Sequence, residues 1–390
     1  TIKMLTSGDC ILTFNATAST PLFDPDPSNN KVSEKTKVKT IFPRSVDKGT
    51  NAGMLVEPDG TVHLIYRKGD DYSQDGDLMY ASKTRSGKWQ YHKIGTCPPY
   101  ISGFFRLAMT SDRTIHVVYS NQDWSLTPKS RLYYGTLTPG RQWQSKIIAV
   151  SDSTFLFPTI DVTSHDELWV AWIKASGLHG TVMIKNTRNG YWQAEKKVGG
   201  GYCHLDIAVD GSDNVHLCTY DVNLGIIYYR VINGIPGPPE QVEPGWKGGQ
   251  KEGLYTSIMT DKMNRPHISY VGQVNNDNRE NTKNAWKENN VWFNEKIDNG
   301  EYFSSINKVA FDPLNAVNLV YFHLPTYMTR FASNFSGNWI KLPIDGSLND
   351  LAMDASGNGH MIVNSIDYVF IPPLDYIKAD PKVLDFEVVQ

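Results

Sequence analysis

A short motif recurs seven times along the chain, and this repeat constrains the fold more than any other feature of the sequence. Each copy is an apolar alternation centred on one position, which is His in five copies, Trp in one and Asn in one. The central residues are His63, His116, Trp169, His216, His267, Asn318 and His360, at intervals of 42–53 residues. A period of this length is typical of repeat proteins, whose units stack to bury a continuous core.

Each copy predicts two β-strands joined by a tight turn. A turn rich in Asp, Gly, Asn or Ser precedes the central alternation, and another short apolar alternation precedes the turn. Five copies continue into a third strand, a turn and a fourth strand that opens with Trp. These residues are Trp89, Trp143, Trp192, Trp292 and Trp339. The fourth copy, "IIYYRVINGIPGPPEQV", has no Trp and a Pro-rich turn instead.

Seven such units predict an all-β fold, a seven-bladed β-propeller with four antiparallel strands per blade. One propeller uses the whole chain, so we expect a single domain over residues 1–390, with residues 1–45 as an N-terminal arm and loop and residues 46–390 as the blades. The seventh unit is short, so a distant segment must supply its outer strand and close the ring. Two segments are candidates, Cys10–Ala16 and Lys382–Val389.

Composition excludes several classes of function. A formal net charge of -3 provides no strong field for nucleic acid or an anionic membrane. No run of 18 apolar residues predicts a membrane span. None of the four cysteines forms a CxxC pair, so no zinc site is expected. Cys203 and Cys218 lie on adjacent predicted strands and could form a disulfide or remain two buried thiols, while Cys10 and Cys97 could tie the arm to the ring.

We expect a secreted, extracellular protein that is a monomer and needs no cofactor. The chain begins with Thr and not Met, which fits a processed N-terminus. The segment Asp24–Asn30, "DPDPSNN", could hold a structural calcium ion, although no other feature indicates one.

The repeated histidine suggests a catalytic base, but its repetition argues against that role. Residues two apart in a strand share a face, and both faces of a propeller blade are largely buried. A residue present in five blades cannot mark five active sites, and Trp169 and Asn318 replace it without disturbing the pattern. We therefore expect the repeat histidines to be packed, hydrogen-bonded scaffold residues.

Function is expected instead in the loops that differ between units. In a propeller, the loops after the second strands and the segments entering the first strands surround one mouth of the central channel. Here they are rich in aromatic, cationic, His and amide side chains, which suits a sugar with a carboxylate. The candidate catalytic residues are Arg106, His204, Tyr72 and Tyr255, and the candidate substrate-binding residues are Arg67, Trp124, Lys174, His323 and Tyr202. No metal ligands are expected.

Arg106 is the most distinctive of these residues. At its predicted register, other blades have the small residues Thr159, Ser257 and Ser305, with His204 as the exception. A charge near the channel mouth needs a partner or a ligand, so either a structural salt bridge or a functional role would account for it.

Parts of the chain resemble sialidase-like propellers. The end of the segment Tyr66–Trp89, "SKTRSGKW", is similar to the Asp-box pattern Ser-x-Asp-x-Gly-x-x-Trp, but it lacks the Asp and its spacing from Ser to Gly is one residue longer. "SNFSGNW" is a second such segment, and "FFRLAM" resembles the sialidase Phe-Arg-Ile-Pro motif without its Pro. The three arginines and the Tyr/Glu pair of true sialidases are not found.

Seven-bladed relatives of this kind include polysaccharide lyases that act on ulvan or rhamnose–glucuronate glycans. The resemblance implies a His and a Tyr as base and acid, with a cation against the uronate carboxylate. Arg106, His204, Tyr72 and Tyr255 could supply these groups.

Three hypotheses follow. The first is a secreted polysaccharide lyase that acts by β-elimination on a uronate-containing glycan at the channel mouth, which predicts a deep pocket with Arg106 near a His and a Tyr. The second is a non-catalytic lectin or adhesion propeller with shallow, repeated sites. The third is a protein-interaction scaffold with a flat apolar face. A glycosidase also stays open, because the separation of two carboxylates cannot be derived from sequence.

Overall fold

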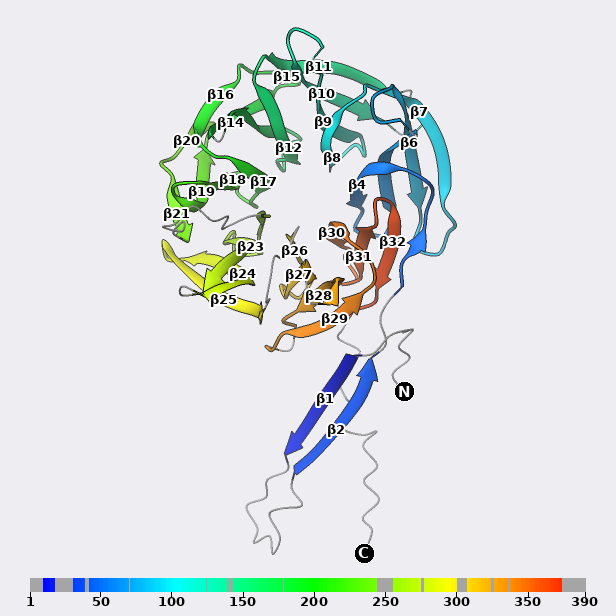
Figure 1. The fold of residues 1–390 in the computed structure, drawn as a ribbon, viewed down its shortest axis with the longest axis vertical. Helices are drawn as coiled ribbons and strands as arrows, with labels where there is room; N and C mark the ends of the chain where they lie inside the picture. Colours follow the sequence, from blue (N-terminus) through cyan, green and yellow to red (C-terminus); the bar gives the residue numbers. More distant parts are fainter. Residues whose placement is uncertain are drawn as a thin grey trace, which may run out of the picture.

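The computed structural model confirms the seven-bladed β-propeller (Figure 1). It describes residues 10–17, 31–38, 42–69, 71–123, 125–138, 140, 143–177, 179–243, 255–274, 277–299, 307–323, 326–335 and 337–373. No α-helix occurs among these residues, and so they contain no helix that could cross a membrane. The blades are antiparallel sheets arranged around a central channel, and each of them places its first strand innermost.

The first four blades follow one another along the chain. Blade 1 contains β4 (Thr50–Val56), β5 (Val62–Lys68), β6 (Gly76–Lys83) and β7 (Gln90–Cys97). Blade 2 contains β8 (Ile101–Met109), β9 (Ile115–Gln122), β10 (Ser130–Leu137) and β11 (Gln144–Ser151). Blade 3 contains β12 (Thr154–Val162), β13 (Leu168–Ser176), β14 (His179–Arg188) and a divided outer strand, β15 (Tyr191–Trp192) and β16 (Lys196–Gly200). Blade 4 contains β17 (Cys203–Val209), β18 (Val215–Asp221), β19 (Gly225–Ile232) and the outer pieces β20 (Ile235–Pro236) and β21 (Glu240–Glu243).

The remaining strands complete the ring and the N-terminal arm. Blade 5 contains β22 (Ser257–Thr260), β23 (Pro266–Val274), β24 (Asp277–Glu288) and β25 (Val291–Asn299). Blade 6 contains β26 (Asn307–Phe311), β27 (Val317–His323), β28 (Met328–Ser333) and β29 (Ile340–Ile344). Blade 7 contains β30 (Leu348–Met353), β31 (Gly359–Val363), β32 (Asp367–Ile371) and β3 (Arg44–Ser45). The arm is a hairpin of β1 (Cys10–Thr17) and β2 (Lys31–Val38).

The ring is closed by β3, which comes from the N-terminal part of the chain and pairs with β32. The prediction that Cys10–Ala16 could be this strand is wrong, because that segment lies in β1 and pairs with β2 in a separate sheet. The alternative, Lys382–Val389, lies outside the described residues, as does the calcium candidate Asp24–Asn30. Val46 follows β3 and is buried among apolar residues of blades 1 and 7.

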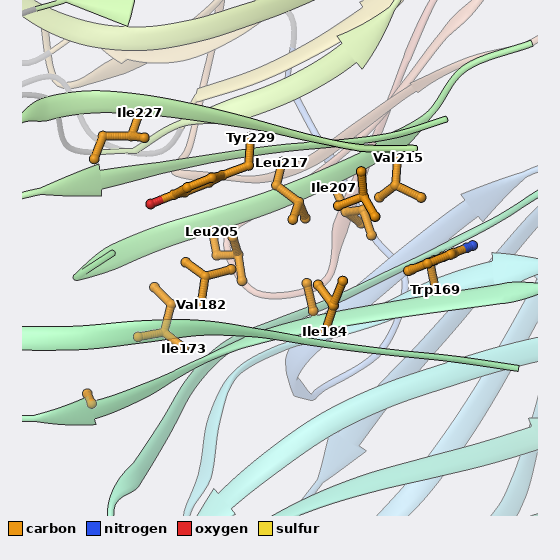
Figure 2. Packing of buried hydrophobic residues seen from close by; sticks show 13 residues of the cluster. Trp169, Ile173, Val182, Ile184, Leu205, Ile207, Val215, Leu217, Ile227 and Tyr229 are labelled. Atoms are coloured by element: carbon orange, nitrogen blue, oxygen red, sulfur yellow. The ribbon is translucent and has the colours of Figure 1, made fainter. Parts of the chain in front are cut away.

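Apolar side chains fill the spaces between neighbouring blades. The second strands β5 and β9 are buried at nearly every position, as expected for strands covered on both faces. Figure 2 shows the cluster between blades 3 and 4, where Ile173 and Val182 of blade 3 face Leu217 and Tyr229 of blade 4. Burial of such surface contributes about 25 cal/mol per Å² and is the main stabilising term of the ring.

The repeat histidines are buried scaffold residues. In four blades, Nδ1 of the histidine lies 2.6–2.8 Å from a tyrosine hydroxyl on the third strand of the same blade. The pairs are His63–Tyr80, His116–Tyr134, His216–Tyr228 and His360–Tyr368. The other ring nitrogen contacts a residue of the preceding turn. These partners are Glu57, Thr110, Asp210 and Asp354.

The two exceptions in the repeat lack this tyrosine. Blade 3 has Ile184 and blade 6 has Phe331 at the equivalent third-strand position, and there the repeat residue is Trp169 or Asn318. Blade 5 has Asn284 at this position and keeps His267, so each of these tyrosines has a histidine partner but the histidine does not require the tyrosine.

The turns between first and second strands link the blades to one another. In five blades one turn residue has a left-handed backbone, with φ of 60–68°. These residues are Arg113, Asp166, Asp213, Asn264 and Asn315. In the last four of them the side chain accepts a backbone N–H from the turn of the preceding blade, at 2.7–3.0 Å.

The described cysteines are free and buried. Cys218 pairs across the sheet with Asp206, and Cys203 pairs with Tyr220, so the two cysteines are out of register. The alternative of two buried thiols in blade 4 is therefore the one observed. Burial raises the pKa of Cys203 to about 12. Cys97 is also free, and the side chain of Cys10 lies outside the described part of the chain.

Candidate active site at the channel mouth

The first strands contribute one residue each to the same level of the channel. These residues are Gly53, Arg106, Thr159, Asp206, Ser257, Lys308 and Asp350, each of which pairs with the second-strand position two residues beyond the repeat centre. The predicted register is thus wrong in two blades, where Asp206 and not His204, and Lys308 and not Ser305, correspond to Arg106.

A β-bulge precedes the channel residue in most first strands. The ladder shifts register just before the channel residue in five first strands, namely β4, β8, β12, β17 and β30. The extra residue of a bulge moves every later side chain of the strand along by one position. The channel residue lies ten residues before the repeat centre in every blade, so counting back from the repeat, and not forward from the strand entrance, identifies it.

Asp206 is the most enclosed charge in this level of the channel. Its Oδ2 lies 3.1 Å from Lys308 Nζ and accepts a hydrogen bond from Ser257 Oγ at 2.8 Å, and Thr159 Oγ1 donates to Oδ1 at 3.3 Å. Burial alone would raise the pKa of Asp206, but the charges of Lys308 and Arg106 and these hydrogen bonds hold it below its usual value. The carboxylate is therefore charged at neutral pH.

Arg106 has only a long ion pair. Its Nη1 lies 3.9 Å from Asp350 Oδ2, and its guanidinium lies 5.9 Å from the ring centroid of Phe104. The side chain is 24% exposed, which leaves hydrogen-bonding capacity for a ligand. Arg106 therefore has a weak structural partner and also lines the pocket.

Three rings form an arc above this charged level. Phe157, His204 and Tyr255 each have a left-handed backbone, with φ of 49°, 53° and 63°. Such a conformation is unusual for bulky residues and is often found at functional sites. The ring centroid of His204 lies 4.7 Å from that of Phe157 and 4.2 Å from that of Tyr255.

Together these groups line one pocket of about 190 Å³ at the channel mouth. Arg106, Asp206 and Lys308 are its charged lining, and His204 and Tyr255 belong to its wall. The remaining lining residues are Ser102, Gly103, Phe104, Phe157, Pro158, Leu205, Thr256 and Asn307. Burial lowers the pKa of His204 to about 4, so its imidazole is neutral at pH 7 and can accept a proton.

Tyr72 and Arg67 lie outside this pocket. Tyr72 packs edge-on against Tyr100 at 6.0 Å and lies beneath the Arg67 guanidinium at 5.8 Å. Arg67 is 1% exposed and donates to the carbonyls of three loop residues, Gly69, Asp71 and Gln74. Its guanidinium holds the loop backbone and is not accessible to a sugar, which argues against the predicted substrate contact.

The other predicted binding residues are also away from the pocket. Lys174 is exposed near the end of β13, and Tyr202 packs against the core between blades 4 and 5. His323 is buried, with Nδ1 2.9 Å from Thr326 Oγ1. None of the three is among the described residues that line the pocket. Trp124 lies outside the described residues.

Sequence reasoning missed two charged residues of the site, Asp206 and Lys308. Each lies ten residues before the centre of its repeat, as Arg106 does, so counting back from the repeat would have found them. Among the described residues, no group of three or more His, Cys, Asp or Glu side chains is placed to hold a metal ion.

Comparison with known proteins identifies the fold and not a family. No protein-family model and no curated protein matches the sequence. A fungal alcohol oxidase in complex with copper is similar at a TM-score of 0.54 and 12% identity, over 87% of this chain and 76% of that one. The polysaccharide lyase Uly1 has a TM-score of 0.49 and 10% identity, over 92% and 96% of the two chains.

A Hadza microbial sialidase, Hz136, has a TM-score of 0.47 and 11% identity over 70% of this chain. The match spans 63% of that sialidase. Identities this low show the fold alone, and the fold is the propeller that the resemblance to sialidase-like proteins implied.

Proposed function

We propose that this protein is a carbohydrate-active propeller that cleaves a uronate-containing glycan by β-elimination at the channel mouth. One observation supports this proposal above all. Arg106, His204 and Tyr255 come from three different blades and line one pocket. The reaction requires a cation for the uronate carboxylate, a base for the proton on C5 and an acid for the leaving oxygen.

Each residue has a defined role in this scheme. Arg106 exchanges its long contact with Asp350 for a bidentate pair with the substrate carboxylate, which stabilises the charge that develops when C5 is deprotonated. Neutral His204 accepts the C5 proton, the electron pair forms the C4–C5 double bond, and the bond from C4 to the glycosidic oxygen breaks. The Tyr255 hydroxyl donates a proton to that oxygen, and solvent restores both residues.

The proposal includes an extracellular location and a polysaccharide as the partner. The channel mouth is open to solvent, so a long chain could lie across it while one unit enters the pocket. Fractionation of the source cells would test the location, because the proposal predicts the protein in the medium or on the cell surface.

The test is incubation with a panel of uronate-containing polysaccharides while absorbance from unsaturated products is followed. We expect product with at least one member of the panel. Arg106→Gln, His204→Asn and Tyr255→Phe should each lower kcat/KM by about 10²-fold or more. Asn is chosen for His204 because it tolerates the left-handed backbone.

Matched controls come from the same face of the ring. Tyr327 is 75% exposed and also has a left-handed backbone, and His179 is exposed at the start of β14. Tyr327→Phe and His179→Asn should leave the rate unchanged. No unsaturated product from any polysaccharide, together with retained glycan binding, would overturn the lyase and leave the second candidate below.

The second candidate is a non-catalytic glycan-binding propeller. It is favoured by the aromatic wall of Phe104, Phe157 and Tyr255 beside Arg106, because stacking and a carboxylate contact could hold a uronate without chemistry. In that case Arg106→Gln would weaken binding, whereas Tyr255→Phe would not, because it keeps the stacking ring and removes only the hydroxyl.

The pH dependence provides a further prediction for the lyase. Because the pKa of His204 is about 4, the base is neutral above that value and protonated below it. The value of kcat/KM should therefore fall as pH decreases through about 4 and should show no loss between pH 5 and 7 from this group. An acidic limb near pH 6.5, the value of an ordinary histidine, would contradict the assignment of His204 as a buried base.

A further inference from the structure

A contact between Trp and Tyr closes three of the interfaces between blades. The Trp at the start of an outer strand packs edge-on against the third-strand Tyr of the preceding blade, with ring centroids 5.0–5.4 Å apart. The pairs are Trp89–Tyr368, Trp192–Tyr134 and Trp292–Tyr228. We call this the Trp–Tyr contact.

The interface between blades 1 and 2 has both residues but does not bring their rings together. Tyr80 stacks instead on His92 of its own blade, with ring centroids 6.4 Å apart. Trp143 lies against the backbones of Gly95 and Gly135, and a Cβ atom at Gly135 would overlap the indole. Trp143 Nε1 is buried and has no hydrogen-bond partner among the described residues.

A cavity of about 600 Å³ lies between the two rings. Cavities also lie between blades 3 and 4 and between blades 6 and 7, where Ile184 and Phe331 replace the tyrosine. All three therefore occur at interfaces without the Trp–Tyr contact. At the interface of blades 1 and 2, however, both rings are present and line the cavity.

Polar groups in fixed positions line the same cavity. His63 connects the Tyr80 hydroxyl, at 2.7 Å, to Glu57, at 2.8 Å, and Arg113 Nη2 donates to the same Glu57 oxygen at 2.6 Å. The Arg113 side chain is 58% exposed, so its other N–H groups face the opening. Aromatic surface beside convergent, pre-positioned donors and acceptors is the composition of small-ligand sites, which occupy about 300–1,000 Å³.

The charges favour a neutral ligand. Arg113 is already paired with Glu57, and the other cation among the described lining residues, Lys93, lies 2.6 Å from Asp77. These described residues leave little positive charge to bind a carboxylate here, in contrast to Arg106 at the channel mouth. A ring with one apolar face and several hydroxyls fits both the indole and the polar groups.

We infer that the cavity between blades 1 and 2 is a second glycan-binding site, which takes one neutral sugar unit against Trp143, His92 and Arg113. Glu57 and Arg113 lie in turns between first and second strands, at the opposite end of the strands from the channel-mouth loops. The site is therefore separate from the proposed active site, and it would hold one part of a glycan while the mouth acts on another.

The test uses the whole protein and a panel of neutral methyl glycosides as probes, measured by ligand-observed NMR and by calorimetry. At least one glycoside should bind. Trp143→Phe removes the Nε1–H and reduces the stacking face, and Arg113→Asn removes the guanidinium but tolerates the left-handed backbone of this position. Each should raise the Kd of the bound glycoside by about tenfold.

Two further variants distinguish binding in this cavity from binding at the channel mouth. Trp192→Phe changes an indole that makes the Trp–Tyr contact, and His204→Asn changes the channel mouth, so neither should alter the Kd. Binding that is lost only in His204→Asn would place the glycoside at the mouth and overturn the inference. Failure of every glycoside to bind would also overturn it. Neither result depends on whether the protein releases unsaturated products.

Discussion

The hydrogen-bond partners of a buried histidine, and not its burial alone, distinguish a scaffold residue such as His116 from a pocket residue such as His204. Burial lowers the pKa to about 4 in both residues. The two ring nitrogens of His116 are engaged within their own blade, by Tyr134 at 2.7 Å and Thr110 at 3.0 Å. His204 has two aromatic neighbours and lines a pocket instead. A lowered pKa is therefore consistent with both roles, and the hydrogen-bond partners distinguish them.

The scaffold histidines should make stability depend on pH. Between the unfolded pKa of about 6.5 and the folded pKa of about 4, the unfolded chain binds more protons at His116 than the folded protein. The free energy of unfolding should therefore decrease as pH is lowered through this window, by up to about 3 kcal/mol for this residue. Urea unfolding at pH 7 and pH 4.5 measures the change.

His116→Asn isolates this contribution, because Asn occupies the equivalent position in blade 6. The variant should be less stable at pH 7, since the Tyr134 hydroxyl loses its partner, but its stability should depend less on pH. His165→Asn, an exposed histidine, is the control. An identical slope for His116→Asn and the natural protein would show that the imidazole is not the group that titrates.

At the scale of the strands and turns, two left-handed positions recur in the blades and serve different ends. One lies in the turn between first and second strands and joins neighbouring blades through the side chains of Asp166, Asp213 and their equivalents. The other lies at the entrance to the first strand and directs Phe157, His204 and Tyr255 into the pocket wall. The residue type is Asp or Asn in most copies of the first position but differs between blades at the second, so under the proposed function the second position would determine specificity.

The turn contact can be tested at Asp213, whose carboxylate accepts from the Ser164 N–H at 2.7 Å and from its hydroxyl at 2.8 Å. Asp213→Asn should be nearly neutral, because its Oδ1 can accept the Ser164 N–H while its Nδ2 donates to the Ser164 hydroxyl, as Asn264 does in the next blade, and Asn tolerates φ of 61°. Asp213→Ala loses the bonds and strains the turn, so it should lower the free energy of unfolding by about 1–3 kcal/mol. Equal stability of the two variants would show that the contact is not stabilising.

Strands and turns differ in how much of their structure the sequence predicts. Alternation identifies the second strands, and repetition gives the number of blades. Both are visible directly in the order of apolar residues along the sequence. The first-strand bulges are not visible in this way. Gly or Asn would mark a left-handed position, but Phe157, His204 and Tyr255 are ordinary strand or loop residues by type. Alignment by the segments that enter the first strands matches Arg106 with His204, whereas counting ten residues back from the repeat centre matches it with Asp206.

At the scale of the whole molecule, ring geometry gathers a pocket from residues far apart in sequence. Loop position and chemistry alone point to Arg106, His204 and Tyr255, and the ring places all three together. The same criteria also select Arg67 and Lys174, but these residues do not line the pocket. The position of a residue in a loop at the channel mouth does not determine where its side chain points. Fold and approximate location are predictable from sequence, whereas the orientation of each side chain is not.

Closure of the ring should depend on Val46, which is 8% exposed and packs between blades 7 and 1. Val46→Asp buries a charge in this interface and should lower the free energy of unfolding by on the order of 3 kcal/mol. Hydrogen exchange should increase first in β32 and β4, which flank the residue. Phe42→Asp is the control, since Phe42 is 55% exposed. Uniform loss of protection around the ring would contradict a local opening at the closure.

The position of β3 has a consequence for how the protein forms in the cell. Its partner β32 is made only after six complete blades have left the ribosome, because β3 precedes them all in the chain and β32 follows them. During synthesis β3 therefore remains unpaired while the blades form one after another. The last step of assembly joins two segments with the largest sequence separation in the ring, and such long-range steps are slow and expose unpaired strand edges. Until that last step is complete, the outer edge of β32 is open to pairing with another chain.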